Sequence, residues 1–327
     1  MHSVAARAGV SQMTVSRVMR GSGYISAEVR NRVMQAAAEI GYVHNRLAGG
    51  ASDYENPLVA VVLPTLQNRV FTEVMTGLSN ALDRHGIRPA FGVTEYSAEE
   101  EERVARDLLS WRPQGLVLTG LEHTEALRDL IRRTGVRTIE IMDTDGEPIQ
   151  SSIGISHRKA GMEMAHHLLD RRHRRFALAA SLEGRDIRAG KRFEAFASVI
   201  LEAGAQIIAQ PLSDGASSMQ LGYRMTQEVW EAQNRVDAVY FSNDDLAAGG
   251  LLYCMAQGLS IPKDLALAGF NGLDFLEAFP QRLTTTVTPR EQIGAAAGQA
   301  IATHRPAVSP DRIKLELDLK LVRGNTS

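Results

Sequence analysis

Three side chains close together near the N-terminus have the chemistry to read DNA bases. Arg17 can donate two parallel hydrogen bonds to guanine, Gln12 can pair with adenine, and Met13 can contact a thymine methyl group. The residue types leave other roles open, because Gln12 could instead be solvated and Met13 could be a packing residue. Other polar side chains nearby could bind phosphates and hold the register without reading sequence. These are Ser11, Thr14, Ser16 and Asn31.

A second set of side chains follows the predicted strands in the rest of the chain. Open α/β sheets bind ligands at the carboxyl ends of their strands. We therefore expect a small-molecule site formed by Gln67, Asn68, Arg69, Phe71, His123, Asp143, Asn243, Asp244 and Asn271. Three of them have simpler alternatives: Asn243 could cap a helix, Asp143 could turn a loop, and Phe71 could pack in the core.

The chain lacks the common motifs of enzyme active sites. We find no nucleophile elbow, phosphate-binding loop, dinucleotide fingerprint or zinc spacing. His166, His167 and His173 are close in sequence, but they lie in a basic segment at a predicted helix end, where positive charge complements the helix dipole. We predict no catalysis, no metal and no cofactor, only a non-covalently bound effector.

Short helices would position the base-reading side chains. Gly9 can end a first helix, Ser11 can cap a second, and Ser26 can start a third that ends at Gly41. Two short helices joined at a glycine and followed by a packing helix are typical of a helix-turn-helix. We assign residues 1–44 to this head.

The next segment, 45–56, is rich in small and polar residues and predicts a linker. From Leu58 onward strands and helices alternate, which indicates parallel sheets with helices on both faces. The length of this body favours two lobes, with a break near Glu147-Pro148. We assign 57–147 and 285–308 to the first lobe, and 148–284 and 309–327 to the second.

Eight strands are expected in the body: 58–63, 88–93, 115–119, 138–141, 176–180, 207–211, 238–241 and 265–270. The tail 315–322 also alternates between apolar and polar residues, as a strand would. Because no leucine heptad follows it, we predict a dimer and not a tetramer.

Charge is distributed unevenly along the 327 residues. Residues 1–52 carry six arginines and two glutamates, a formal charge of +4, whereas the net charge of the chain is −2. A basic head on an acidic body favours a polyanionic partner for the head. No apolar run is long enough to span a membrane and no secretory signal is visible, so we expect a cytoplasmic protein. The single cysteine agrees with a reducing compartment.

The segment Val4-Ala5-Ala6-Arg7-Ala8-Gly9-Val10-Ser11-Gln12-Met13-Thr14-Val15-Ser16-Arg17-Val18 closely resembles the lactose-repressor (LacI/GalR) family. The resemblance covers almost the whole chain and continues at Gly41-Tyr42, Asn45-Arg46, Ser242-Asn243-Asp244, Ala268-Gly269-Phe270 and Leu283-Thr284-Thr285. Within the family the chain resembles gluconate-operon repressors, on the segments 45–49, 118–124 and 140–143.

The resemblance implies a homodimer that reads a pseudo-palindromic operator in double-stranded DNA. Gln12, Met13 and Arg17 match the base-reading positions of the family's recognition helix. Asn45 and Ala51 lie in the linker, which in the family folds into a hinge helix on DNA and inserts a leucine into the minor groove. Ala51 aligns with that leucine, and an alanine wedges poorly between bases, so the sequence leaves open whether this hinge folds and kinks DNA.

The resemblance also implies a sugar or sugar-acid effector bound between the lobes. Arg192 matches the family's ligand-clamping arginine, and such a group can grip a carboxylate through two charge-assisted bonds. Asn271 stands where many sugar-binding members carry an aspartate, and a neutral amide does not repel an acid. With Arg69 or His123 nearby, these residues favour an acidic ligand such as gluconate or a phosphorylated relative.

We therefore predict a DNA-binding transcriptional regulator, a repressor whose operator affinity is controlled by the effector. Two alternatives belong to other classes. A periplasmic-type sugar-binding transport protein would share the body, but it would carry an export signal and no DNA-binding head. A sugar-acid enzyme could also use this body, but no acid/base pair at motif spacing supports it.

Overall fold

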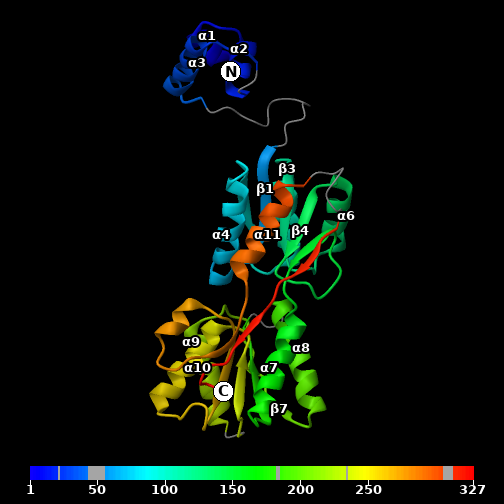
Figure 1. The fold of residues 1–327 in the computed structure, drawn as a ribbon, viewed down its shortest axis with the longest axis vertical. Helices are drawn as coiled ribbons and strands as arrows, with labels where there is room; N and C mark the ends of the chain where they lie inside the picture. The colour runs from blue at the N-terminus through cyan, green and yellow to red at the C-terminus, as the bar shows by residue number, and fades with distance from the viewer. Residues whose placement is uncertain (21–22, 43–55, 182–184, 233–234, 305–311) are drawn as a thin grey trace. The chain divides into compact units, whose positions relative to one another are not determined.

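The structure is a computed structural model that describes residues 1–20, 23–42, 56–181, 185–232, 235–304 and 312–327. The chain divides into two compact units, Met1–Asn56 and Pro57–Ser327. The first is a three-helix head, and the second is a body of two lobes, each built on a six-stranded sheet (Figure 1). The expected fold class, a helix-turn-helix head with a two-lobed α/β body, is confirmed.

The head consists of α1 (His2–Ala8), α2 (Gln12–Arg20) and α3 (Ala27–Glu39). Gly9 ends α1 in the left-handed conformation, with φ of 63°. Ser11 accepts a hydrogen bond from the backbone N–H of Thr14 at 3.1 Å, and Ser26 caps α3. The three helices share one small core, which includes Val4, Val15, Val18, Val33 and Ala37.

The first lobe contains a sheet in the order β11-β5-β4-β3-β1-β2. Its strands are β1 (Asn56–Leu63), β2 (Arg88–Val93), β3 (Pro113–Thr119), β4 (Arg137–Ile141), β5 (Ser151–Gly154) and β11 (Lys314–Glu316). One face packs against α4 (Arg69–Asp83) and α11 (Arg290–Ala302), and the other against α5 (Ala98–Leu109) and α6 (Glu125–Thr134). Alternate residues of the strands thus supply two separate cores.

The second lobe repeats this architecture with the order β12-β10-β9-β8-β6-β7. Its strands are β6 (Arg175–Ala179), β7 (Gln206–Ala209), β8 (Ala238–Phe241), β9 (Ala266–Asn271), β10 (Thr284–Val287) and β12 (Lys320–Val322). The helices α7 (His157–Asp170) and α8 (Ile187–Glu202) cover one face, and α9 (Met219–Glu231) and α10 (Asp244–Gln257) cover the other. A short 3-10 helix, η2 (Asp274–Ala278), follows β9.

The lobe boundaries differ from those expected, because the chain passes between the lobes three times. β5 pairs with β4 in the first sheet, so the break comes after Gly154 and not near Glu147-Pro148. β10 pairs with β9 in the second sheet, and α11 then returns to the first lobe. The tail is also not one strand: β11 pairs with β5 and β12 with β10, so it contributes an edge to each sheet.

The helix pairs that cover the sheets cross at very short distances. A Cβ atom added to Gly161 in α7 would lie 2.1 Å from the backbone oxygen of Arg192 in α8. The pairs α4–α11 and α9–α10 also cross at glycines, at Gly294 and Gly222. At Gly161 this close approach sets the distance between α7 and α8, and therefore the position of the basic side chains at the start of α8.

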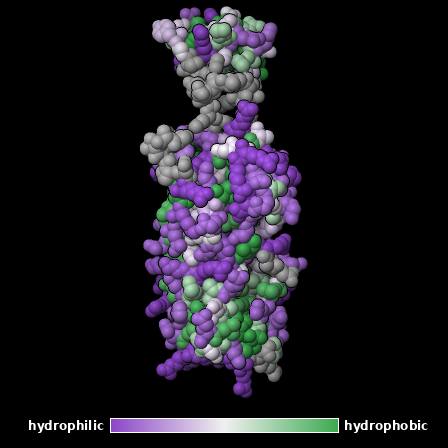
Figure 2. Space-filling model, turned by 90° about the vertical axis from the view of Figure 1, so that its right-hand side faces the viewer, coloured by the Kyte–Doolittle hydropathy of each residue, from purple (hydrophilic) through white to green (hydrophobic). Residues whose placement is uncertain are grey.

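The described residues contain no helix with the length and apolarity that a bilayer crossing requires. One face of the molecule is hydrophilic over much of the body, with apolar residues gathered over the second lobe (Figure 2). Large exposed apolar side chains of that lobe include Leu201, Leu212, Leu252 and Met255.

Candidate functional sites

Helix α2 presents the three predicted base-reading side chains to solvent. Gln12, Met13 and Arg17 are exposed, with Met13 at 64%, whereas Val15 and Val18 on the opposite side are buried in the head core. The helical period therefore separates a packing face from a free face. That free face carries an amide, a thioether and a guanidinium, which suit base edges of different kinds.

The predicted phosphate-binding residues surround this face. The hydroxyl of Ser11 caps α2 and lies 3.0 Å from that of Thr14, so both hydroxyls already have partners. Ser16 is half-buried, and Asn31 is exposed on α3. Asn45 and Ala51 lie outside the described residues.

In the body, the side chain of Arg192 is turned toward internal partners. It is buried, its Nη2 donates to the backbone oxygen of Ser242 at 2.7 Å, and its guanidinium carbon lies 3.8 Å from the centre of the Phe270 ring. Its Nη1 lies 2.9 Å from Nδ1 of His157. The expected clamp is therefore already bonded within the second lobe.

His157 can accept a hydrogen bond from Arg192 because its imidazole ring is neutral. Burial, together with the positive charge of Arg192, lowers the pKa of His157 well below its ordinary value, so the ring is neutral. Its Nε2 donates to the backbone oxygen of Met142 at 2.8 Å, which leaves Nδ1 as an acceptor for Arg192. Since Met142 follows β4, this chain of bonds links the two lobes.

Asp143 lies at the same lobe junction, paired with a lysine that the sequence analysis missed. The Nζ atom of Lys191 is 2.6 Å from Asp143 Oδ2 and 2.6 Å from Glu122 Oε1, and it donates to the backbone oxygen of Asp145. Burial raises the pKa of Asp143, and the bond from Lys191 opposes that rise. Lys191 could have been found from the sequence by its spacing from Arg188 and Arg192, because residues three and four positions apart share one face of a helix.

The three candidates after β8 and β9 have structural partners. Asn243 caps α10, accepting from the N–H of Leu246 at 3.1 Å. Asp244 accepts from the N–H of Leu273 at 2.9 Å and from the hydroxyl of Thr285 at 2.7 Å, and burial raises its pKa to about 6.

Asn271, at the end of β9, has a positive φ of 119° and a buried side chain, and its backbone oxygen accepts a bond from Arg290.

The candidates after β1 are divided between solvent and core. Asn68 caps α4 through the N–H of Val70, at 3.0 Å, and Phe71 is buried in the first-lobe core. Gln67 and Arg69 are exposed, and Arg69 lies 3.8 Å from Asp274. Of these, Phe71 still faces the other lobe, because the guanidinium of Arg188 lies 5.7 Å from the centre of its ring.

His123 belongs to a different part of the first lobe. Its Nδ1 is 2.7 Å from Glu101 and its Nε2 is 3.4 Å from Glu140. Burial alone would lower the pKa of His123, but the two carboxylates outweigh it and raise the pKa to about 9. His123 is therefore a buried cation between two acids.

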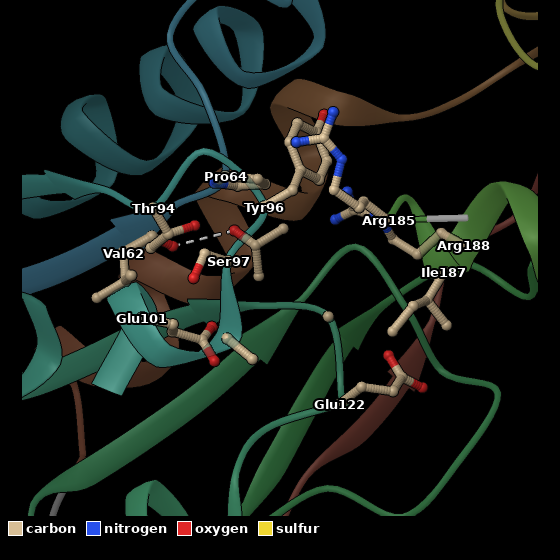
Figure 3. A pocket seen from close by; sticks show the side chains of 13 residues that line it. Val62, Pro64, Thr94, Tyr96, Ser97, Glu101, Glu122, Arg185, Ile187 and Arg188 are labelled. Carbon is tan, nitrogen blue, oxygen red and sulfur yellow. Dashed lines mark hydrogen bonds between the residues drawn. The ribbon is translucent and has the colours of Figure 1, made fainter. Parts of the chain in front are cut away.

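A cavity of about 100 Å³ lies where both lobes contribute side chains (Figure 3). The first lobe supplies Thr94, Tyr96, Ser97, Glu101 and Glu122, among others, and the second supplies Arg185, Ile187 and Arg188. None of the effector-binding residues expected from the sequence lines it, although Arg192 and His123 are close in sequence to residues that do. Sequence reasoning missed Arg188 because nothing but its place on α8 distinguishes it from other arginines.

Comparisons with known proteins agree with this division into head and body. The profile described as "Bacterial regulatory proteins, lacI family" matches residues 1–45, and that described as "Periplasmic binding proteins and sugar binding domain of LacI family" matches residues 56–319. The HTH-type transcriptional regulator GntR of Pseudomonas aeruginosa is 36% identical to this chain, over 92% of this chain and 88% of that protein.

Solved structures show the same likeness. The crystal structure of a LacI-family transcriptional regulator from Silicibacter pomeroyi is 42% identical, with a TM-score of 0.93 over 99% of this chain and 98% of that one. That of the regulator GntR from Chromobacterium violaceum is 31% identical, with a TM-score of 0.76 over 83% of this chain and 99% of that one. These relatives are regulators, so the transport and enzyme alternatives are set aside. The chain belongs to the LacI family of bacterial regulatory proteins and is a DNA-binding transcriptional regulator.

Proposed function

We propose that this regulator represses an operon for the use of a sugar acid, and that an acid such as gluconate binds between its lobes. The observation that carries the proposal is a cavity between the lobes that two guanidinium groups reach, those of Arg185 and of Arg188 at the start of α8. Guanidinium groups stabilise a carboxylate or phosphate, whereas a neutral sugar does not require them.

For DNA binding, the free face of α2 reads the major groove of a pseudo-palindromic operator, one head per half-site. Gln12, Met13 and Arg17 contact base edges, and Ser11, Thr14, Ser16 and Asn31 contact phosphates. Two heads require a homodimer, and the exposed apolar side chains of Leu252 and Met255 on α10 offer surface for one. This activity places the protein in the cytoplasm.

Effector and operator are coupled through the lobe junction. The junction holds bonds that cross between the lobes, from Lys191 to Asp143 and from His157 to the backbone of Met142. A ligand that binds one arrangement of the lobes more tightly shifts their equilibrium toward it. In a dimer such a shift changes the spacing of the two heads, and therefore the affinity for the operator.

A thermal denaturation screen tests the effector class. A ligand that binds only the native state raises the melting temperature by mass action. We expect gluconate or 6-phosphogluconate to raise it, and glucose and glucitol at the same concentration to raise it much less. Equal shifts for acids and neutral sugars would contradict an acidic effector.

A further inference from the structure

We infer that Arg188 holds the acidic group of the effector, in the cavity between the lobes. This inference deepens the proposed function and rests on it, because it names the residue that would select an acid. Arg188 is in the first turn of α8 and reaches the cavity together with Arg185, toward Tyr96 (Figure 3).

Arg192 does not line this cavity, and both of its terminal nitrogens already have partners. One terminal nitrogen donates to the Ser242 backbone and the other to His157, while one flat face lies on Phe270. A bidentate grip on a carboxylate needs two free N–H groups on one edge. Nε of Arg192 has no hydrogen-bond partner among the described residues, so a bidentate grip there would compete with the bonds to His157 and Ser242.

The guanidinium of Arg188, in contrast, lines the cavity and has few partners. In the described part of the chain it makes one hydrogen bond, an ion pair from Nε to the carboxylate of Asp186 at 3.3 Å. Both terminal nitrogens thus have no hydrogen-bond partner among those residues. Its exposed fraction is only 9%, and Phe71 lies beneath the guanidinium. A largely desolvated guanidinium that still reaches a cavity binds an anion more strongly than a fully hydrated one.

The remaining walls of the cavity indicate how the rest of the ligand is held. Thr94 and Tyr96 offer hydroxyl groups, and the carboxylates of Glu101 and Glu122, which are paired with His123 and Lys191, lie away from the two arginines (Figure 3). Carboxylates accept hydrogen bonds from hydroxyls and repel a second acid. The ligand class that matches the chemistry of this lining is a short polyhydroxy acid, with its acidic group at Arg188 and its hydroxyls toward the glutamates.

Calorimetry on the full chain tests this assignment with D-gluconate and its neutral alcohol D-glucitol. The unchanged protein should prefer gluconate. Arg188→Gln should weaken gluconate binding about tenfold to a hundredfold, as expected for loss of a charge-assisted pair, and should leave glucitol binding unchanged. Arg188→Lys should keep part of the preference, because an ammonium keeps the charge without the paired geometry. Arg224→Gln, which removes an exposed arginine on α9, is the matched control and should bind both ligands normally.

The outcomes separate the two proposals. If the unchanged protein binds both ligands equally, the acidic effector itself is wrong. If it prefers gluconate and Arg188→Gln keeps that preference, the assignment to Arg188 is wrong while the proposed function stands. If Arg188→Gln fails to fold, the Arg188→Lys variant tests the assignment instead. A preference of that variant for gluconate over glucitol as large as that of the unchanged protein would overturn the inference.

Discussion

Two arginines on α8 have the same side-chain chemistry but different contacts. Arg188 and Arg192 are both buried arginines one helical turn apart, yet one bonds to the backbone of the second lobe and the other faces a cavity. The difference arises from neutral His157, which provides an acceptor for Arg192. Sequence alone cannot supply this, because the acceptors come from residues 35 and 50 positions away.

At the same scale, Arg17 should read one base pair in each half-site. Replacing it with alanine removes a bidentate contact, so preference at that base pair should relax, at a cost of about 1–3 kcal/mol per contact. Binding measured against an operator and its single-base variants checks this. Equal weakening on every sequence would show that Arg17 contacts phosphate instead.

His123 should make stability depend on pH in the alkaline range. Because its pKa is raised to about 9, the charged ring stabilises the fold fully below pH 6.5, and this contribution is lost as the pH rises through 9. The loss should approach about 3 kcal/mol, and His123→Gln should lack it. Urea unfolding of both proteins between pH 6.5 and 10 isolates the difference. Parallel pH profiles would contradict the buried-cation assignment.

The close helix crossing at Gly161 positions the cationic face of α8. Gly161→Ala should push α8 away from α7, which should destabilise the protein by about 1–3 kcal/mol and weaken effector binding. Gly190→Ala is the control in the same helix pair, since nothing lies within 4 Å of an added Cβ there, and it should stabilise by up to about 1 kcal/mol. Denaturant unfolding and calorimetry measure both effects. Equal behaviour of the two variants would exclude a positioning role for the crossing.

Most elements could be predicted from periodicity, and the exceptions have a physical reason. The strands at 88–93 and 238–241 match their predicted bounds, and the second is a buried apolar run. β5 was missed because it is four residues long, with serines buried by pairing and not by hydrophobicity. The tail was read as one strand because alternation continues through residues 317–319, where the chain changes sheets.

For the whole molecule, we expect a homodimer. Light scattering at micromolar concentration should give twice the mass of the 35.7 kDa chain. A stable tetramer, or a monomer at that concentration, would contradict this expectation.

The central claim is that an effector in the body controls DNA binding by the head. The direct measurement is fluorescence anisotropy of an operator, selected from a random-sequence pool with this protein, during titration with gluconate. Coupling energies of this kind are typically about 1–3 kcal/mol, so operator affinity should change by about fivefold or more, and the operator should change gluconate affinity by the same factor. Gluconate that binds the body while operator affinity stays the same would contradict the claim.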